Sequence, residues 1–261
     1  MRYLFGRIAS FFTPPVYVVK KPKAANGVDG RILAYTDNNS TIAEQYRVLR
    51  TNLYSFSPEK PIKTILLTSS QSEEGKTLTS VNLAYTLSLD IGKKVILIDS
   101  DLRRPAVHKM LGCDRKPGFA DILSGKADIE YFLSKPAFGN LHVIPTGTIV
   151  DNPSEMLSSG KIKDLLEILK ARFDYIIFDT PPVINVTDAS VLGSICDAVF
   201  LVVKAGVTPK DMVEESYNML KRAQAQPKAT ILTNVIIPIH QYYRASYRYY
   251  YRYRYGHGRR V

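Results

Sequence analysis

Six short runs of aliphatic and β-branched residues constrain the fold of this chain more than any other feature. Most are almost continuously apolar, which is the pattern of strands buried on both faces. They are Ile62–Thr68, Lys94–Asp99, Leu141–Pro145, Tyr175–Asp179, Ala198–Val203 and Thr230–Val235. Predicted helices lie between them, at Thr77–Leu89, Ser158–Arg172, Thr187–Ser194 and Lys210–Ala225. This alternation predicts an α/β fold with a doubly wound, mainly parallel sheet and helices on both faces.

One more amphipathic segment precedes the first predicted strand. Residues 41–54 begin with a T-x-x-E capping box, in which Thr41 is the expected N-cap and Glu44 its partner. The apolar stripe of the predicted helix consists of Ile42, Tyr46, Leu49 and Leu53.

The positive charge of the chain is confined to its two ends. The formal net charge is +11, from 35 basic and 24 acidic residues. Residues 1–25 contain five basic residues, residues 240–261 contain six, and neither segment has an acidic residue, so the part between them is neutral. We therefore divide the chain into a basic arm (1–38), a folded domain (39–239) and a Tyr/Arg-rich tail (240–261).

Other classes of protein are excluded by what the chain lacks. No run approaches the 18 apolar residues of a membrane span. The apolar start is split by Arg7 and ended by Pro14, so we do not interpret it as a signal peptide. Cys113 and Cys196 are too few for a disulfide framework, which favours a reducing compartment.

The first predicted strand runs into a phosphate-binding motif. Residues 70–77 read S-Q-S-E-E-G-K-T, a P-loop in which Ser70 replaces the first glycine, and a helix follows at once. The backbone N–H groups of such a loop bind phosphates, Lys76 neutralises them, and the Thr77 hydroxyl binds Mg²⁺.

Two other strands end in carboxylates. The second predicted strand ends in Asp99-Ser100-Asp101 and the fourth in Asp179. Ligands bind outside the carboxyl ends of parallel strands, and Mg²⁺ prefers hard oxygen ligands. Three such strand ends in one chain predict a site for a nucleotide and Mg²⁺.

Together these motifs resemble those of bacterial tyrosine kinases of capsule and exopolysaccharide synthesis, which are P-loop NTPases related to MinD. Residues 70–77, 96–103 and 178–182 resemble the family's Walker A, A′ and B motifs. The segment N-P-S-E-M-L at 152–157 resembles another family motif. Glu44, Arg47 and Arg50 match its E-x-x-R-x-x-R oligomerisation helix, and the tail matches its tyrosine cluster.

The same loop separates this chain from partition and division-site ATPases. Those relatives have K-G-G-x-G-K-T, whose first lysine would stand at position 71, where this chain has Gln71. That lysine reaches a partner's phosphates, so its absence argues against a sandwich-dimer ATPase.

The resemblance implies ATP-dependent autophosphorylation on tyrosine by a non-specific protein-tyrosine kinase. The expected catalytic residues are Lys76, Asp99, Asp101 and Asp179, with Asp99 best placed to accept the tyrosine proton. Thr77, Asp101 and Asp179 are the expected Mg²⁺ ligands. The expected nucleotide-binding residues are Ser70, Glu74, Gly75, Lys76, Thr77, Leu78, Arg103 and Asn234.

The tail would be the substrate. Its expected phosphorylation sites are Tyr242, Tyr243, Tyr247, Tyr249, Tyr250, Tyr251, Tyr253 and Tyr255. The resemblance further implies a ring-shaped homo-oligomer, a separate transmembrane activator of the polysaccharide chain-length type and a cognate tyrosine phosphatase. It places the protein in the cytoplasm, against the inner face of the plasma membrane through its partner.

Two alternative functions remain open from the sequence. One is a MinD-like ATPase whose segment Met1–Phe12 binds a membrane surface. The other is an ATPase whose Tyr/Arg tail binds single-stranded nucleic acid or a polyanionic glycan. The second leaves the P-loop without a purpose, so we expect no nucleic-acid partner.

Overall fold

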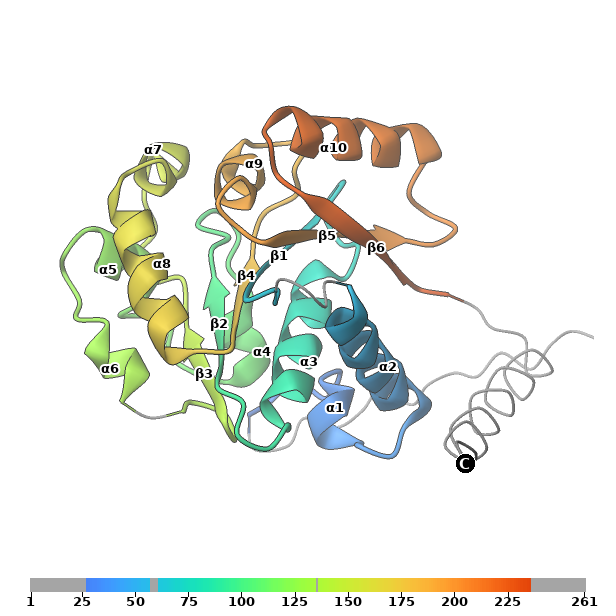
Figure 1. Ribbon diagram of the computed structural model, residues 1–261, viewed down its shortest axis with the longest axis horizontal. Helices are drawn as coiled ribbons and strands as arrows, with labels where there is room; N and C mark the ends of the chain where they lie inside the picture. The colour runs from blue at the N-terminus through green and yellow to red at the C-terminus, as the bar shows by residue number, and fades with distance from the viewer. Residues whose placement is uncertain (1–26, 57–60, 135, 236–261) are drawn as a thin grey trace, which may run out of the picture. The chain divides into compact units, whose positions relative to one another are not determined.

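Six strands form one parallel sheet at the centre of the protein (Figure 1). The structure is a computed structural model and describes residues 27–56, 61–134 and 136–235. The strands are β1 (Thr64–Ser69), β2 (Val95–Asp99), β3 (Leu141–Ile144), β4 (Tyr175–Asp179), β5 (Ala198–Lys204) and β6 (Pro227–Thr233). Their order is β3-β2-β4-β1-β5-β6, and all the pairs are parallel. The predicted fold class is confirmed.

Ten helices lie in the described part of the chain. The longer ones are α2 (Thr41–Ser55), α3 (Lys76–Ser88), α8 (Lys161–Arg172) and α10 (Lys210–Arg222). The shorter ones are α1 (Leu33–Thr36), α4 (Val107–Leu111), α5 (Phe119–Leu123), α6 (Glu130–Leu133), α7 (Pro153–Leu157) and α9 (Asp188–Gly193).

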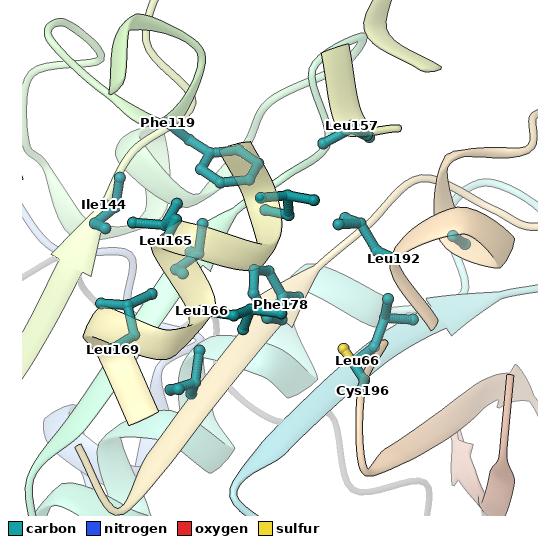
Figure 2. Packing of buried hydrophobic residues seen from close by; sticks show 14 of the residues in the cluster. Leu66, Phe119, Ile144, Leu157, Leu165, Leu166, Leu169, Phe178, Leu192 and Cys196 are labelled. Carbon is teal, nitrogen blue, oxygen red and sulfur yellow. The ribbon is translucent and has the colours of Figure 1, made fainter. Parts of the chain in front are cut away.

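Helices cover both faces of the sheet because both faces of its inner strands are apolar. In β1, Leu66 points into one core, whereas Ile65 and Leu67 point into the other. The first core lies between the sheet and α5, α8 and α9, where Phe119 packs close to Phe178 (Figure 2). The second core lies between the sheet and α2, α3 and α4. This two-sided burial explains why the strands read as continuous apolar runs.

The strand order places the three predicted motifs side by side. Strand β4 lies between β1 and β2, so all three carboxyl ends meet at one edge of the sheet. Asp179 at the end of β4 is in register with Asp99 of β2 and with Leu67 of β1. Motifs more than 100 residues apart are thereby brought together at one site.

Helix α2 forms where it was predicted, but two of its details differ. Its N-cap is Ser40, whose hydroxyl accepts the N–H of Ala43, and not Thr41. Ser40 enters the helix with extended backbone, which is the geometry an N-cap needs. Ile42 is 39% exposed, and Ala43 takes its place on the buried face.

The described part of the expected amino-terminal arm is ordered. From residue 27 onward it contributes buried side chains to the second core, among them Val28 and Ile32. The backbone N–H of Asp29 also donates to the carbonyl of Met110 in α4. The described residues from 27 to 233 belong to one compact unit. The remainder of the arm, residues 1–26, lies outside the described residues.

Candidate active site

The P-loop connects β1 to α3 and leaves the start of that helix open. Gly75 is the N-cap of α3, with a left-handed φ of 87°, and no side chain caps this end. A Cβ at Gly75 would meet the methyl carbon of Thr233 at 3.4 Å, an ordinary contact, so it is the left-handed conformation that favours glycine here. The open amino end of this 13-residue helix presents unpaired N–H groups to an anion.

Glu74 supports the loop from inside. It is buried, and its carboxylate accepts the backbone N–H groups of Ser70 at 2.7 Å and Gln71 at 3.1 Å. The Thr208 hydroxyl also donates to this carboxylate, and the Thr233 hydroxyl donates to the Glu74 carbonyl at 2.7 Å. The Glu74 side chain, expected at the nucleotide, therefore links the loop to the segment that follows β5, and the Glu74 carbonyl links the loop to β6.

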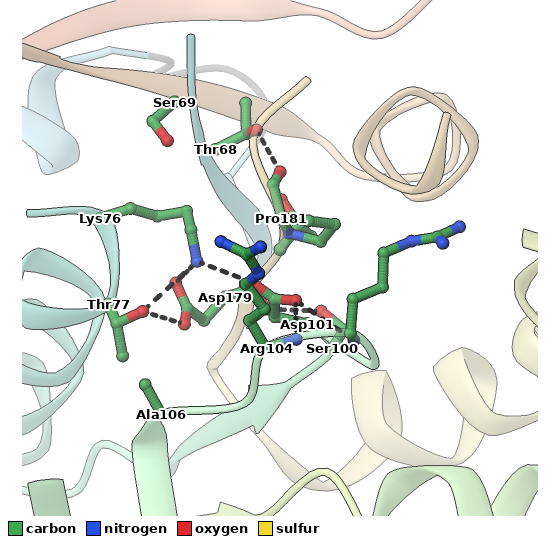
Figure 3. Close-up of polar contacts among 12 residues, drawn as sticks. Thr68, Ser69, Lys76, Thr77, Ser100, Asp101, Arg104, Ala106, Asp179 and Pro181 are labelled. Atoms are coloured by element: carbon green, nitrogen blue, oxygen red, sulfur yellow. Dashed lines mark hydrogen bonds and ion pairs between the residues drawn. The ribbon is translucent and has the colours of Figure 1, made fainter. Parts of the chain in front are cut away.

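Asp179 accepts hydrogen bonds from three donors of α3, and two of them, Lys76 and Thr77, are labelled in Figure 3. Its Oδ1 accepts hydrogen bonds from Lys76 Nζ and from the Ser80 hydroxyl, both at 3.0 Å. Its Oδ2 accepts the Thr77 hydroxyl at 2.7 Å. The last residue of β4 is thus joined to the first two turns of α3, and Ser80 is a member of the site that sequence reasoning missed.

Lys76 is the cation at the centre of the site. Its Nζ lies 3.0 Å from Asp179 and 3.7 Å from Asp101. Burial lowers the pKa of its ammonium group, but Asp179 and Asp101 outweigh that effect, so the pKa is raised. Lys76 therefore stays protonated at neutral pH, as a phosphate-binding lysine must.

Asp99, the last residue of β2, and Asp101 fix the loop 100–106. Asp101 accepts the backbone N–H groups of Arg103 at 3.3 Å and Arg104 at 2.9 Å. Asp99 is fully buried and accepts those of Ala106 at 3.2 Å and of Val107 at 3.1 Å. Each carboxylate thus holds one half of the loop.

Asp99 differs from an ordinary carboxyl in its acidity. Burial and the nearby Asp179 raise its pKa to about 7, against a smaller opposing effect of Lys76. A carboxyl with that pKa exchanges a proton readily at neutral pH, which is the property of a general base.

Arg103 is already paired within the chain. Its guanidinium donates to the buried carboxylate of Asp188 at 3.1 Å and 3.2 Å and to the Ser154 hydroxyl at 3.2 Å. Ser154 in turn donates to Asp188 at 2.6 Å. The hydrogen bond to Asp188 raises the pKa of Arg103. Its expected contact with phosphate stays a prediction, because the structure gives it this other role.

These residues fit a magnesium-bound nucleotide. The open end of α3 and Lys76 suit phosphates, and the buried Ser70 hydroxyl has no hydrogen-bond partner among the described residues. Nowhere in the described part of the chain do three or more acidic, His or Cys side chains form a metal cage. A Thr hydroxyl and one or two carboxylates are nevertheless enough for Mg²⁺, which keeps several waters and binds phosphate oxygens.

Comparison with known proteins agrees with this geometry. A family model described as an AAA domain matches residues 62–240. The chain is 34% identical to the tyrosine-protein kinase YwqD of Bacillus subtilis, over 81% of this chain and 89% of that protein. It also resembles the solved kinase domain of the Escherichia coli tyrosine kinase ETK, with a TM-score of 0.76 and 30% identity over 82% of this chain and 83% of the other. This protein belongs to the bacterial tyrosine-protein kinase family.

The fold is shared more widely than the family. MinD from Pyrococcus horikoshii, solved with Mg-ADP, superposes with a TM-score of 0.55 at 23% identity, over 70% of this chain and 76% of that chain. A likeness at that identity concerns the fold alone. The kinase family thus uses the MinD-type P-loop architecture that the motif order predicted.

Helix α2 carries the three residues that the kinase family motif assigns to oligomerisation. Arg47 bonds Glu44 at 2.6 Å and also donates to Asn38. Arg50 pairs with Asp90 at 2.5 Å and donates to the Thr86 carbonyl at 3.1 Å. In this structure the three side chains make contacts within one subunit, and their role between subunits stays a prediction.

The remaining predicted residues of this kinase are accounted for as follows. Leu78 lies in the first turn of α3 and is partly buried. Asn234 lies just beyond the compact unit, is exposed and has a left-handed φ of 56°. All eight tail tyrosines lie outside the described residues. Within the described ranges no helix is long and apolar enough to span a bilayer.

Proposed function

We propose that this protein transfers the terminal phosphate of ATP to tyrosines of its own tail, in trans within a ring of identical subunits. The observation that carries the proposal is the meeting of Lys76, Asp101 and Asp179 beside the uncapped start of α3. Phosphoryl transfer needs mainly positioning and neutralisation of charge, and this arrangement supplies both.

The residues divide the work according to their contacts. The open N–H groups of α3 and the Lys76 ammonium would bind the phosphates. Thr77, Asp101 and Asp179 would hold Mg²⁺, which when bound neutralises negative charge on the phosphate oxygens. Asp179 would then exchange part of its present bonding to Lys76 for the metal.

Asp99 is the proposed base for the tyrosine hydroxyl. A phenol with a pKa of about 10 is a poor nucleophile at neutral pH unless a base takes its proton. The pKa of Asp99, about 7, suits that task. Because backbone N–H groups occupy its carboxylate, direct contact with a tyrosine requires the loop 100–106 to shift.

The tail offers eight tyrosines among six arginines, and its phosphorylation would reverse its charge. Each phosphotyrosine adds about −1.5 to −2 charges, so three or four would cancel the +6 of residues 240–261. A tail attracted to an acidic site would then be released, which would loosen the ring.

The motifs that this chain shares with its family extend the proposal to the biological setting. The ring would form through Glu44, Arg47 and Arg50, and a separate transmembrane protein would activate it at the inner face of the plasma membrane. A cognate phosphatase would reset the tail. The outcome would be control of exopolysaccharide or capsule synthesis and export.

Phosphotyrosine formation tests the proposal directly. The purified protein is incubated with Mg-ATP and probed with an anti-phosphotyrosine antibody, alongside Lys76→Met and a tail in which all eight tyrosines are phenylalanine. We expect a signal in the wild type and in the control Lys126→Met, whose exposed lysine lies outside the site, and none in the other two. ATP hydrolysis without phosphotyrosine would instead support the MinD-like ATPase.

A further inference from the structure

The loop between β2 and α4 carries two consecutive arginines that the structure treats differently. Arg103 is occupied by the buried carboxylate of Asp188 and by Ser154. Its positive charge is therefore balanced inside the protein and is unavailable to a ligand without breaking that ion pair.

Arg104 has a fixed backbone. Its N–H donates to the Asp101 carboxylate at 2.9 Å, and Pro105, which follows, restricts its backbone to extended conformations. Two and three residues further on, the backbone N–H groups of Ala106 and Val107 donate to Asp99. The Cα of Arg104 is thus anchored to the aspartates that also face the P-loop lysine.

The side chain of Arg104 is unpaired. It is exposed, and within the described residues no carboxylate lies at ion-pair distance and no acceptor takes a hydrogen bond from it. Figure 3 shows it turned toward the side of the site where Lys76 and Asp179 lie. An arginine with a fixed backbone and a free guanidinium at a phosphate site is ready to bind an anion.

The charge of the site shows why a second cation is needed. Lys76 is surrounded by Asp99, Asp101 and Asp179, all of which raise its pKa. Position 71, where related ATPases carry another lysine, is Gln71. Even with Mg²⁺, a nucleoside triphosphate keeps negative charge that these groups leave unbalanced.

We propose that Arg104 binds the terminal phosphate of the bound nucleotide and so makes the site discriminate ATP from ADP. This inference rests on the proposed function, because it assumes that the P-loop holds a nucleoside triphosphate. A charge-assisted, bidentate contact made only to the third phosphate adds to triphosphate affinity and leaves diphosphate affinity unchanged.

Equilibrium binding separates this role from a structural one. Titration calorimetry with Mg-ADP and with an ATP analogue whose β–γ bridge cannot be cleaved is carried out on the wild type, Arg104→Gln and Arg104→Lys. We expect Arg104→Gln to lose about tenfold in affinity for the triphosphate and less than about twofold for ADP, with partial recovery in Arg104→Lys. The matched control is Arg222→Gln, an exposed arginine at the far end of α10.

The outcomes distinguish the two proposals. The role of Arg104 would be overturned if Arg104→Gln lost affinity equally for both nucleotides, or for neither. This holds provided that the variant unfolds at the same temperature as the wild type. A wild type that binds both nucleotides yet forms no phosphotyrosine would overturn the kinase proposal, while the change in discrimination at position 104 would still support this contact.

Discussion

Asp179 shows how one side chain can keep a phosphate site in order. It is fully buried, and it satisfies Lys76, Thr77 and Ser80 at the same time. Without Asp179, buried Lys76 would keep only its longer ion pair with Asp101, at 3.7 Å, and a poorly balanced buried charge is strongly unfavourable. The same carboxylate therefore preserves the site before a nucleotide arrives and offers oxygens to Mg²⁺ afterwards.

The raised pKa of Asp99 predicts a specific pH dependence of stability. Its pKa is about 7 in the folded protein and about 4 in an unfolded chain, so the folded state binds the proton more tightly. The stability it contributes is fully present below about pH 4 and is lost as the pH rises through about 7. Urea unfolding measures the free energy of unfolding at pH 5 and at pH 8. Between these two pH values the wild type should lose more of it than Asp99→Asn does. Equal losses in the two proteins would contradict this prediction.

Glu74 and its neighbour Glu73 form a matched pair for testing the support of the P-loop. Glu74→Ala leaves the N–H groups of Ser70 and Gln71 without their acceptor, which should destabilise the protein by about 1–3 kcal/mol and weaken ATP binding. Glu73→Ala, at an exposed position where the side chain has no hydrogen bond or ion pair with the described residues, should change the free energy of unfolding by less than about 0.5 kcal/mol. Denaturant unfolding and nucleotide titration measure both effects. Similar results for the two variants would contradict the role of Glu74 in supporting the P-loop.

Among the elements, the inner strands were the most predictable from the sequence. The polar contacts between distant segments were the least predictable. Strands β1, β2 and β4 lie within two residues of their predicted bounds because their apolar runs are buried on both faces. Strand β6 was predicted at 230–235 but spans Pro227–Thr233, because pairing with β5 sets its start. An edge strand that alternates between half-buried and exposed residues gives a weaker signal in the sequence.

The site was predictable where a motif is continuous and not where contacts join distant segments. Lys76, Thr77 and Asp179 were found from strand ends and the P-loop. The contacts of Glu74 with Thr208 and Thr233 join residues more than 130 positions apart, and no local pattern indicates them. The partner of Arg103 is 85 positions away, although the N-P-S-E segment marked Ser154.

Helix α2 supplies a test of which of its apolar residues stabilise the fold. Leu53 is buried in the second core, whereas Ile42 is 39% exposed. We expect Leu53→Ala to reduce the free energy of unfolding by about 2–4 kcal/mol and Ile42→Ala by less than about 1 kcal/mol. Urea denaturation of the two variants measures this difference. Comparable losses would mean that the helix packs with the stripe first predicted from the sequence.

For the molecule as a whole, the contact between Thr233 and Glu74 fixes the point from which the Tyr/Arg-rich tail continues. Strand β6 ends at Thr233, whose hydroxyl is bonded to the P-loop, so the chain continues toward its tyrosines from a point beside its own active site. The contour length from this root is about 30 Å for Tyr242, nine residues on, and about 75 Å for Tyr255, 22 residues on.

If the tail is phosphorylated between subunits, as proposed, its length limits which tyrosines can reach a neighbouring active site. If adjacent active sites in the proposed ring are further apart than about 30 Å, we expect the distal tyrosines to be modified before the proximal ones. Time-resolved mass spectrometry of the tail after addition of Mg-ATP should show Tyr253 and Tyr255 phosphorylated first. Inserting a ten-residue flexible linker after Val235 should shift the earliest sites toward Tyr242, so the order of modification reports the spacing of active sites in the assembly.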